Sequence, residues 1–462
     1  MLGKICKIMR KSSCVSHQNQ VVNQESVHGE TLAAKWVVCD TCIEQNKPCT
    51  SHSITSTTTQ PNSSFAHAVI NMIGMLIGLG QLTTPYALEN GGWLSVLMLV
   101  GIGIICGYTS HLLGKCLENS PKSKSYSDIG EEAFGSTGRV IASVFIYMEI
   151  FMALVSYTIS LHDNIATVFA GTEISKVFTW SGKLGSSQLL TMIAVMVALP
   201  SLWLRNLSSV SFLSSGGILM SLLIFGCVGL TAILGYVRSN HRIPLLHLQN
   251  IPSISGLYVF SFAGHIVFPN LYKSMKDPSK FTKVSIVSFS CVTILYTSLA
   301  FMGAKMFGPQ VSSQITLSMP RNVIFTKIAL WATVLTPMTK YALEFAPFAI
   351  QLEHSLPKSL TSKMKMIIRA TVGSIILLVI LALALSFPYF QHVLGLTGSL
   401  VSVSICIVLP CVFYIKISWP HIPKSSLILN VTLVVFGVLL GIVGTISSSR
   451  LLIITLLKAH ST

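Results

Sequence analysis

Apolar stretches of about 20 residues recur along the chain from Phe65 to its end, separated by short polar segments. Each stretch is long enough to cross the roughly 30 Å hydrocarbon core of a bilayer as a helix. The pattern predicts an all-α integral membrane protein with about 11 transmembrane helices. Their predicted spans are 65–88, 92–116, 139–169, 188–204, 211–236, 256–275, 283–306, 323–352, 366–387, 393–416 and 427–447.

The predicted organisation has three parts. Residues 1–64 are polar and rich in Ser, Thr, Asn and Gln, which favours a disordered cytosolic tail. Residues 65–447 form the transmembrane domain, followed by a short tail at 448–462, where Leu451 to Leu457 could extend the last helix or lie at the interface. In the tail, Cys39, Cys42 and Cys49 are compatible with a zinc knuckle or with reduced thiols.

Composition and charge agree with a membrane protein. Hydrophobic residues make up 51% of the chain and charged residues 10%, against roughly 25% charged in soluble domains. The net charge is +16, but Lys and Arg lie mostly in short loops, which argues for a bilayer and against nucleic acid. Their distribution predicts a cytosolic N-terminus and a C-terminus on the far side. No phosphate-binding loop, paired-histidine metal motif or nucleophile elbow indicates an enzyme, a cofactor or a metal site.

Two of the predicted helices are interrupted in the same way. The first contains Gly78 and the segment Gly80-Gln-Leu-Thr-Thr-Pro85, and the sixth contains Gly264-His-Ile-Val-Phe-Pro269. Gly weakens a helix and Pro removes a donor, so both helices are expected to unwind within the bilayer. Unwound backbone survives there only where it faces a cavity or buried protein. Matching breaks in spans one and six predict a five-plus-five repeat with a binding site between them.

These residues also carry a resemblance to a known family. The chain resembles the plant vacuolar amino-acid transporters of the amino acid/auxin permease family over about residues 64–447. The motifs that carry it are Ala68-Val-Ile-Asn71, Gly78-Leu-Gly80, Thr84-Pro-Tyr-Ala-Leu88, Gly264-His-Ile-Val-Phe-Pro-Asn270, Pro337-Met-Thr-Lys-Tyr-Ala-Leu343 and Gly395-Leu-Thr-Gly-Ser399. It departs from the family at Gln81, where an aliphatic residue is usual, at Ala263, where Ser or Gly is frequent, and at Leu161-His162.

The resemblance implies a leucine-transporter-like fold of the APC superfamily. Its inverted repeats would be 65–236 and 256–416, with 427–447 added. It implies proton-coupled transport of neutral amino acids, usually across the vacuolar membrane, with the plasma membrane as the other possibility. The partners expected are the amino acid, protons and lipid. The alternative function is an amino-acid-sensing transceptor without substantial turnover.

The expected substrate-binding residues lie at the two breaks. They are Asn71, Gly78, Leu79, Gly80, Gln81, Ser261, Phe262, Ala263 and Gly264. Three ionisable residues at membrane depth are candidates for coupling, and each has a structural alternative. His265 could change charge or stay a neutral imidazole bonded to a freed carbonyl, and Lys340 could couple or pair with Glu344. Glu149 could carry a proton or join two helices by a hydrogen bond.

Overall fold

The computed structural model describes residues 63–172, 185–199, 207–237, 241–357, 360–419 and 421–461. The predicted N-terminal tail, with its Cys cluster, lies outside the described residues except for Ser63 and Ser64. Ser63 forms a parallel bridge with Met275, which joins the start of the first span to the end of the sixth.

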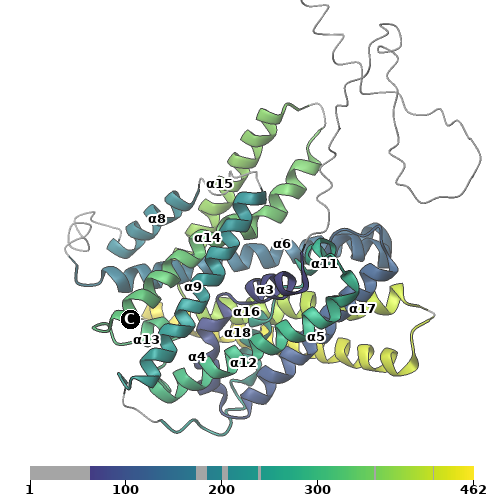
Figure 1. Ribbon diagram of the computed structural model, residues 1–462. Coiled ribbons are helices and arrows are strands. Elements are labelled where there is room, and N and C mark those ends of the chain that lie inside the picture. Colours follow the sequence, from purple (N-terminus) through teal and green to yellow (C-terminus); the bar gives the residue numbers. More distant parts are fainter. Residues whose placement is uncertain are drawn as a thin grey trace, which may run out of the picture. The chain divides into compact units, whose positions relative to one another are not determined.

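The described chain is helical throughout its apolar part (Figure 1). Seven of its helices are long and apolar enough to cross a membrane, or eight if the bent pair α3 and α4 is one span. The other predicted spans correspond to the shorter helix α8, the broken pair α10 and α11, and α14, which contains Lys327, Lys340 and Glu344.

In the first half of the chain the helices are α3 (Phe65–Leu76), α4 (Gly80–Gly91), α5 (Ser95–Asn119), α6 (Tyr126–Phe169), α8 (Ser186–Ala198) and α9 (Leu207–Ile233). The second half contains α10 (Ile251–Ser261), α11 (Phe268–Ser274), α12 (Phe281–Phe307), α13 (Ile315–Ser318), α14 (Ile324–Ser355), α15 (Ser362–Ser386), α16 (Phe390–Thr397), α17 (Leu409–Ile417) and α18 (Lys424–Ser461). Short 3-10 turns, η4 (Pro278–Lys280) and η5 (Gly308–Gln310), flank α12.

Helix packing follows the predicted repeat. The helix α12 of the second half packs against α4 and α5 of the first half. The helix α5 of the first half also contacts α10 and α11 of the second. The helix α14 packs against α9 and α6, and α16 with α17 packs against α6 in turn. Figure 1 shows α5 beside α12, in agreement with these contacts. Span seven therefore lies on span one as span two lies on span six, which is the relation that two structural repeats require.

The first span breaks where the glycines predict it. The helix α3 ends at Leu76, Ile77 is extended, and α4 begins at Gly80 with its axis bent by 58°. Pro85 lies inside α4 and cannot donate to the carbonyl of Gln81. The Thr84 hydroxyl donates to that carbonyl instead, at 3.1 Å, so the proline is tolerated without a second break.

The sixth span breaks between Ser261 and Phe268, and Pro269 lies in the first turn of α11. The equal spacing of Gly and Pro in the two segments therefore does not give equivalent positions. Gly80 starts a helix and Pro85 lies inside it, whereas Gly264 lies within the unwound segment and Pro269 begins a helix. Proline has no amide donor to lose in a first turn, which explains its place there.

Two boundaries differ clearly from the expected ones, and the tenth span has an unexpected internal structure. The third span starts earlier, at Tyr126, because a capping box between Ser125 and Asp128 begins the helix before a kink at Phe134 and Gly135. The expected C-terminal tail at 448–462 is helical as far as Ser461, because the apolar run at Leu451 to Leu457 extends α18. The tenth span contains two π-helical segments, η6 (Gly398–Ser402) and η7 (Ser404–Val408).

Candidate functional site

A cavity of ≈ 150 Å³ lies between the two broken spans. Five parts of the fold contribute to it: the α3–α4 break, α6, the α10–α11 break, α14 and η7. Its lining residues are Met75, Leu76, Gly78, Leu79, Gly80, Glu149, Ile150, Ala153, Tyr157, Phe260, Ala263, Gly264, His265, Ile266, Val267, Lys340, Glu344 and Ile405.

Most of the expected site residues line this cavity together. Gly78, Leu79 and Gly80 come from the first break, and Ala263 and Gly264 come from the sixth span. The three coupling candidates, His265, Lys340 and Glu149, line it as well. The breaks and the ionisable side chains thus converge at one place.

Four expected residues do not line the cavity. Asn71 is exposed on α3, more than one turn before the break. Gln81 is buried, and its Oε1 has no hydrogen-bond partner among the described residues. Ser261 is buried against Gly80, where a Cβ atom would lie 2.5 Å from the Ser261 Cα. Ser261 therefore packs against the first break instead of lining the cavity.

Phe262 is the fourth, and it turns away from the cavity with its neighbour Phe268. The Phe262 ring packs against Phe289 and Tyr296, with ring centroids 6.1 and 5.5 Å away. The Phe268 ring packs against Phe289 at 6.0 Å. The apolar wall is made instead by Ile150 and Ala153 of α6, with others from α10 and η7. Side-chain direction at an unwound segment follows no helical period, so the sequence gives no signal for it.

Backbone groups at both breaks lack partners. Among the described backbone hydrogen bonds, the N–H groups of Leu79 and Gly80 have no acceptor, and the carbonyls of Phe262 and Ala263 have no donor. The first break thus offers donors at the start of α4, where the helix dipole is positive, and the sixth offers acceptors.

A tyrosine that the sequence analysis did not identify joins the two breaks. The Tyr296 hydroxyl of α12 lies 2.8 Å from the carbonyl of Leu76 and 3.0 Å from that of Ser261. These are the last residues of α3 and α10, whose carbonyls have lost their helical partners. The one sequence feature that could have indicated this role is the presence of a tyrosine, with its hydroxyl, in the middle of an apolar helix.

His265 is fully buried, and its hydrogen bonds fix its tautomer. Its Nε2 lies 3.1 Å from the carbonyl of Cys106 and 3.0 Å from Thr109 Oγ1. A carbonyl can only accept, so in the neutral ring Nε2 carries the hydrogen and donates it to Cys106. The other nitrogen, Nδ1, is then a bare acceptor, and it has no partner among the described residues. The carbonyl is on α5, not at a break.

Lys340 and Glu149 contact different parts of the fold. The Lys340 Nζ donates to the carbonyl of Gly74 on α3 at 3.5 Å, and Glu344 lies one turn further along α14. The ion pair with Glu344, the structural alternative for Lys340, is not among those that the described residues form. Glu149 accepts from the Ser402 hydroxyl at 2.9 and 3.0 Å, so the interhelical hydrogen bond is present. Among the described residues no group of His, Cys, Asp and Glu could hold a metal.

Comparison with known proteins gives concordant results. The sequence profile of a family described as "Transmembrane amino acid transporter protein" matches residues 61–450. The chain is 60% identical to "Amino acid transporter AVT1H" of Arabidopsis thaliana, over 92% of this chain and 100% of that protein. It is 38% identical to "Amino acid transporter AVT1E" of the same plant, over 86% of this chain and 75% of that protein.

Solved structures share the fold at low sequence identity. MhsT in complex with L-phenylalanine matches with a TM-score of 0.53 and 14% identity, over 85% of this chain and 98% of that one. The inward-facing conformation of Mhp1 matches with a TM-score of 0.51 and 13% identity, over 87% and 92% of the two chains. The leucine-transporter-like fold implied by the resemblance is thereby confirmed.

Proposed function

The chain belongs to the transmembrane amino acid transporter family, and on that premise we propose that it moves neutral amino acids by proton-coupled alternating access. It is a multi-pass amino acid transporter and not an enzyme. The observation that carries the proposal is the cavity lined by both breaks, where the N–H groups of Leu79 and Gly80 and the carbonyl of Ala263 have no backbone partner among the described residues. A zwitterionic amino acid needs both kinds of group.

In this proposal the substrate carboxylate binds the N–H groups at the start of α4, and its ammonium group binds the freed carbonyl of Ala263, which lines the cavity. Hydrogen bonds to a charged group contribute roughly 1.5–3 kcal/mol each. The apolar wall formed by Ile150, Ala153 and Ile405 favours a substrate with an apolar side chain. The cavity volume of ≈ 150 Å³ favours a free amino acid over a peptide as the substrate.

Recognition of the carboxylate has a direct test. Leucine and isopentylamine differ only by the carboxylate, so the amine leaves the N–H groups of Leu79 and Gly80 without an acceptor. We expect isopentylamine to compete at least about a hundredfold more weakly against labelled substrate, because two such hydrogen bonds contribute roughly 3–6 kcal/mol. Equal inhibition by the two compounds would contradict binding at the first break.

Coupling to protons is supported by the cations and acceptors at the cavity. The Lys340 ammonium lies beside the Gly74 carbonyl of α3. A metal cation bound there would need such oxygen atoms as ligands, and the lysine side chain takes its place. The bare Nδ1 of His265 can accept a proton, and a carboxyl group at Glu149 can do so as well. We assign coupling to Lys340 or His265, with Glu149 as the third candidate.

Uptake by purified protein in liposomes tests this function. With an imposed pH gradient, we expect labelled amino acid to accumulate equally in sodium and in choline buffers. Loss of uptake in choline at a constant pH gradient would exclude proton coupling without sodium. Saturable binding without any accumulation would instead favour the transceptor function.

We also propose the vacuolar membrane as the site of action, on the strength of the family resemblance. A fluorescent fusion should co-purify with vacuolar membranes on a density gradient. Co-purification with the plasma membrane would assign the same topology to the cell surface.

A further inference from the structure

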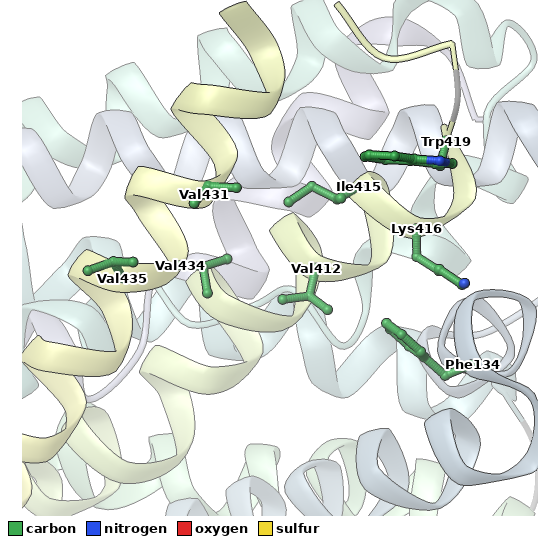
Figure 2. Close-up of a pocket in the computed structure, with 8 residues that line it drawn as sticks. All are labelled: Phe134, Val412, Ile415, Lys416, Trp419, Val431, Val434 and Val435. Carbon is green, nitrogen blue, oxygen red and sulfur yellow. The ribbon is translucent and has the colours of Figure 1, made fainter. Parts of the chain in front are cut away.

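A second hollow lies far from the broken spans in the sequence, between the last two membrane helices. It has a volume of ≈ 330 Å³, within the roughly 300–1,000 Å³ range of ligand pockets. We call it the valine groove, and Figure 2 shows the residues that line it: Phe134, Val412, Ile415, Lys416, Trp419, Val431, Val434 and Val435.

The groove is amphipathic along its length. Figure 2 shows Val431, Val434 and Val435 of α18 on one side and Phe134, Lys416 and Trp419 on the other, with Val412 and Ile415 of α17 between them. Short β-branched side chains on two neighbouring helices leave a trough between them because they do not reach across. Since both helices cross the membrane, the apolar end of this trough is open to lipid chains.

The kink in α6 gives the groove its aromatic edge. Gly135 has φ of 64°, a conformation that strains other residues, and the chain there leaves the helical path. Phe134 is consequently 45% exposed, although its ring lies only 6.5 Å from that of the buried Phe413. The kink therefore presents an aromatic ring at the groove without detaching it from α17.

The charge at this end has no ion-pair partner among the residues that the structure describes. The ion pairs described for the chain join Lys115 to Glu118, Arg139 to Asp128 and Glu131, and Lys280 to Asp277, and none of them includes the exposed Lys416. Trp419, three residues on, is 61% exposed. A free cation next to an exposed indole, at the end of a membrane helix, is the arrangement found at lipid headgroup level.

From this arrangement we propose that the valine groove is a binding site for an anionic glycerophospholipid. One acyl chain lies along the valines, the phosphate accepts a charge-assisted hydrogen bond from Lys416 Nζ, and Phe134 and Trp419 pack against the glycerol region. The positive-inside distribution puts this end on the cytosolic side, where the leaflet carries anionic lipid. The site is independent of the transport cavity, so it can fail without affecting the proposed function.

The test compares two lipids that differ only in headgroup charge. Delipidated protein in detergent is titrated with phosphatidylglycerol or phosphatidylcholine of identical chains. Thermal stability and bound lipid, counted by native mass spectrometry, are the two readouts. We expect phosphatidylglycerol to bind more tightly. Lys416→Gln should weaken phosphatidylglycerol roughly fivefold and leave phosphatidylcholine unchanged. The control Lys122→Gln, which removes an exposed charge outside the groove, should keep the preference.

A second pair of variants tests the apolar end without changing charge. Val434→Trp fills the groove and should lower retention of both lipids, whereas Val443→Trp, on an exposed part of α18 outside the groove, should not. Equal binding of the two lipids by the wild type, or an unchanged preference in Lys416→Gln, would overturn the proposal. Stabilisation by a sterol alone, by inorganic phosphate alone, or by dimerisation that Val434→Trp abolishes would overturn it as well.

Discussion

Glycine at position 80 is required by the close approach of the two breaks. A Cβ atom there would lie 2.5 Å from the Ser261 Cα and 2.6 Å from its Oγ, so one of the two backbones would have to move. Gly101 on α5 has nothing within 4 Å of the same atom. The two glycines thus differ in what a side chain would contact, although both lie in membrane-spanning segments.

We expect Gly80→Val to abolish transport, because the branched side chain forces α4 away from α10 and changes the cavity between them. Overpacking of this kind costs typically 1–3 kcal/mol, so the protein should remain folded with a lowered melting temperature. Uptake in liposomes and a thermal melt measure the two effects. Gly101→Val is the matched control and should transport normally. Normal uptake by Gly80→Val would contradict the close contact with Ser261.

The positions of the site residues could be predicted from the sequence only in part. Gly78 and Gly80 were identifiable because glycine and proline interrupt an apolar helix, and Lys340 because a charge at membrane depth is unusual. Asn71 and Phe262 do not line the cavity, since a motif position does not tell which way a side chain points. Tyr157 was missed, although it follows Glu149 and Ala153 at intervals of four on α6 and so shares their face.

At the scale of elements, the breaks depend on side chains from intact neighbouring helices. The unwound ends of α3 and α10 both have carbonyls near the single hydroxyl of Tyr296. One hydroxyl hydrogen can be shared between the two acceptors or donated to either, so the hydroxyl stabilises the broken spans as a pair. Sequence pattern can predict where a helix stops, but it cannot identify the distant donor that satisfies its end.

Tyr296→Phe keeps the ring that packs on Phe262 and removes only the hydroxyl. Both carbonyls then lose this donor, so we expect a destabilisation of roughly 1–3 kcal/mol together with slower transport. Tyr108→Phe is the control, because its hydroxyl contacts Asn430 of α18 and not a break. Thermal melts and initial uptake rates distinguish the variants. Equal effects of the two substitutions would show that Tyr296 has no special role at the breaks.

The tenth span shows a similar dependence at its π-helical segments. Ser402, at the end of η6, donates to Glu149, and Ile405 in η7 both lines the cavity and accepts from the Tyr126 hydroxyl at 2.7 Å. Wide turns of this kind are frequent at functional sites. Pro410 lies two residues after η7, but a proline in a membrane helix does not tell which turns widen, so the position of η7 could be found only from the structure.

Removal of the Ser402 hydroxyl tests whether Glu149 titrates during transport. Ser402→Ala leaves a buried carboxyl group without its donor, which favours the protonated acid. If Glu149 carries the proton, the pH profile of uptake by Ser402→Ala should shift toward higher pH. Adding Glu149→Gln to that variant should remove the shift. If Glu149 only joins the helices, both variants should lower stability and leave the profile unchanged.

At the scale of the whole molecule, the packing of repeat-related helices and the distribution of Lys and Arg bear on different questions. The contacts of α12 with α5 and of α14 with α6 follow from the fold, which the resemblance implied. The direction in which the bundle crosses the membrane is not a property of these contacts. It depends on the charges of the loops, and so it stays a prediction.

The predicted topology has a cytosolic N-terminus, an odd number of spans and a C-terminus on the far side. Two consequences can be measured in sealed vesicles. The Asn62-Ser-Ser sequon should remain unglycosylated, because Asn62 precedes the first span on the cytosolic side.

The second consequence concerns α18. Its 38 residues make a helix of roughly 57 Å, longer than the roughly 30 Å core. A cysteine added after Thr462 should therefore react with a membrane-impermeant maleimide only after the vesicles are opened. A cysteine added before Met1, in a variant lacking the native tail cysteines, is the control and should react from outside in cytosol-side-out vesicles. Reaction of the C-terminal cysteine in those intact vesicles would require an even number of spans and would overturn the predicted topology.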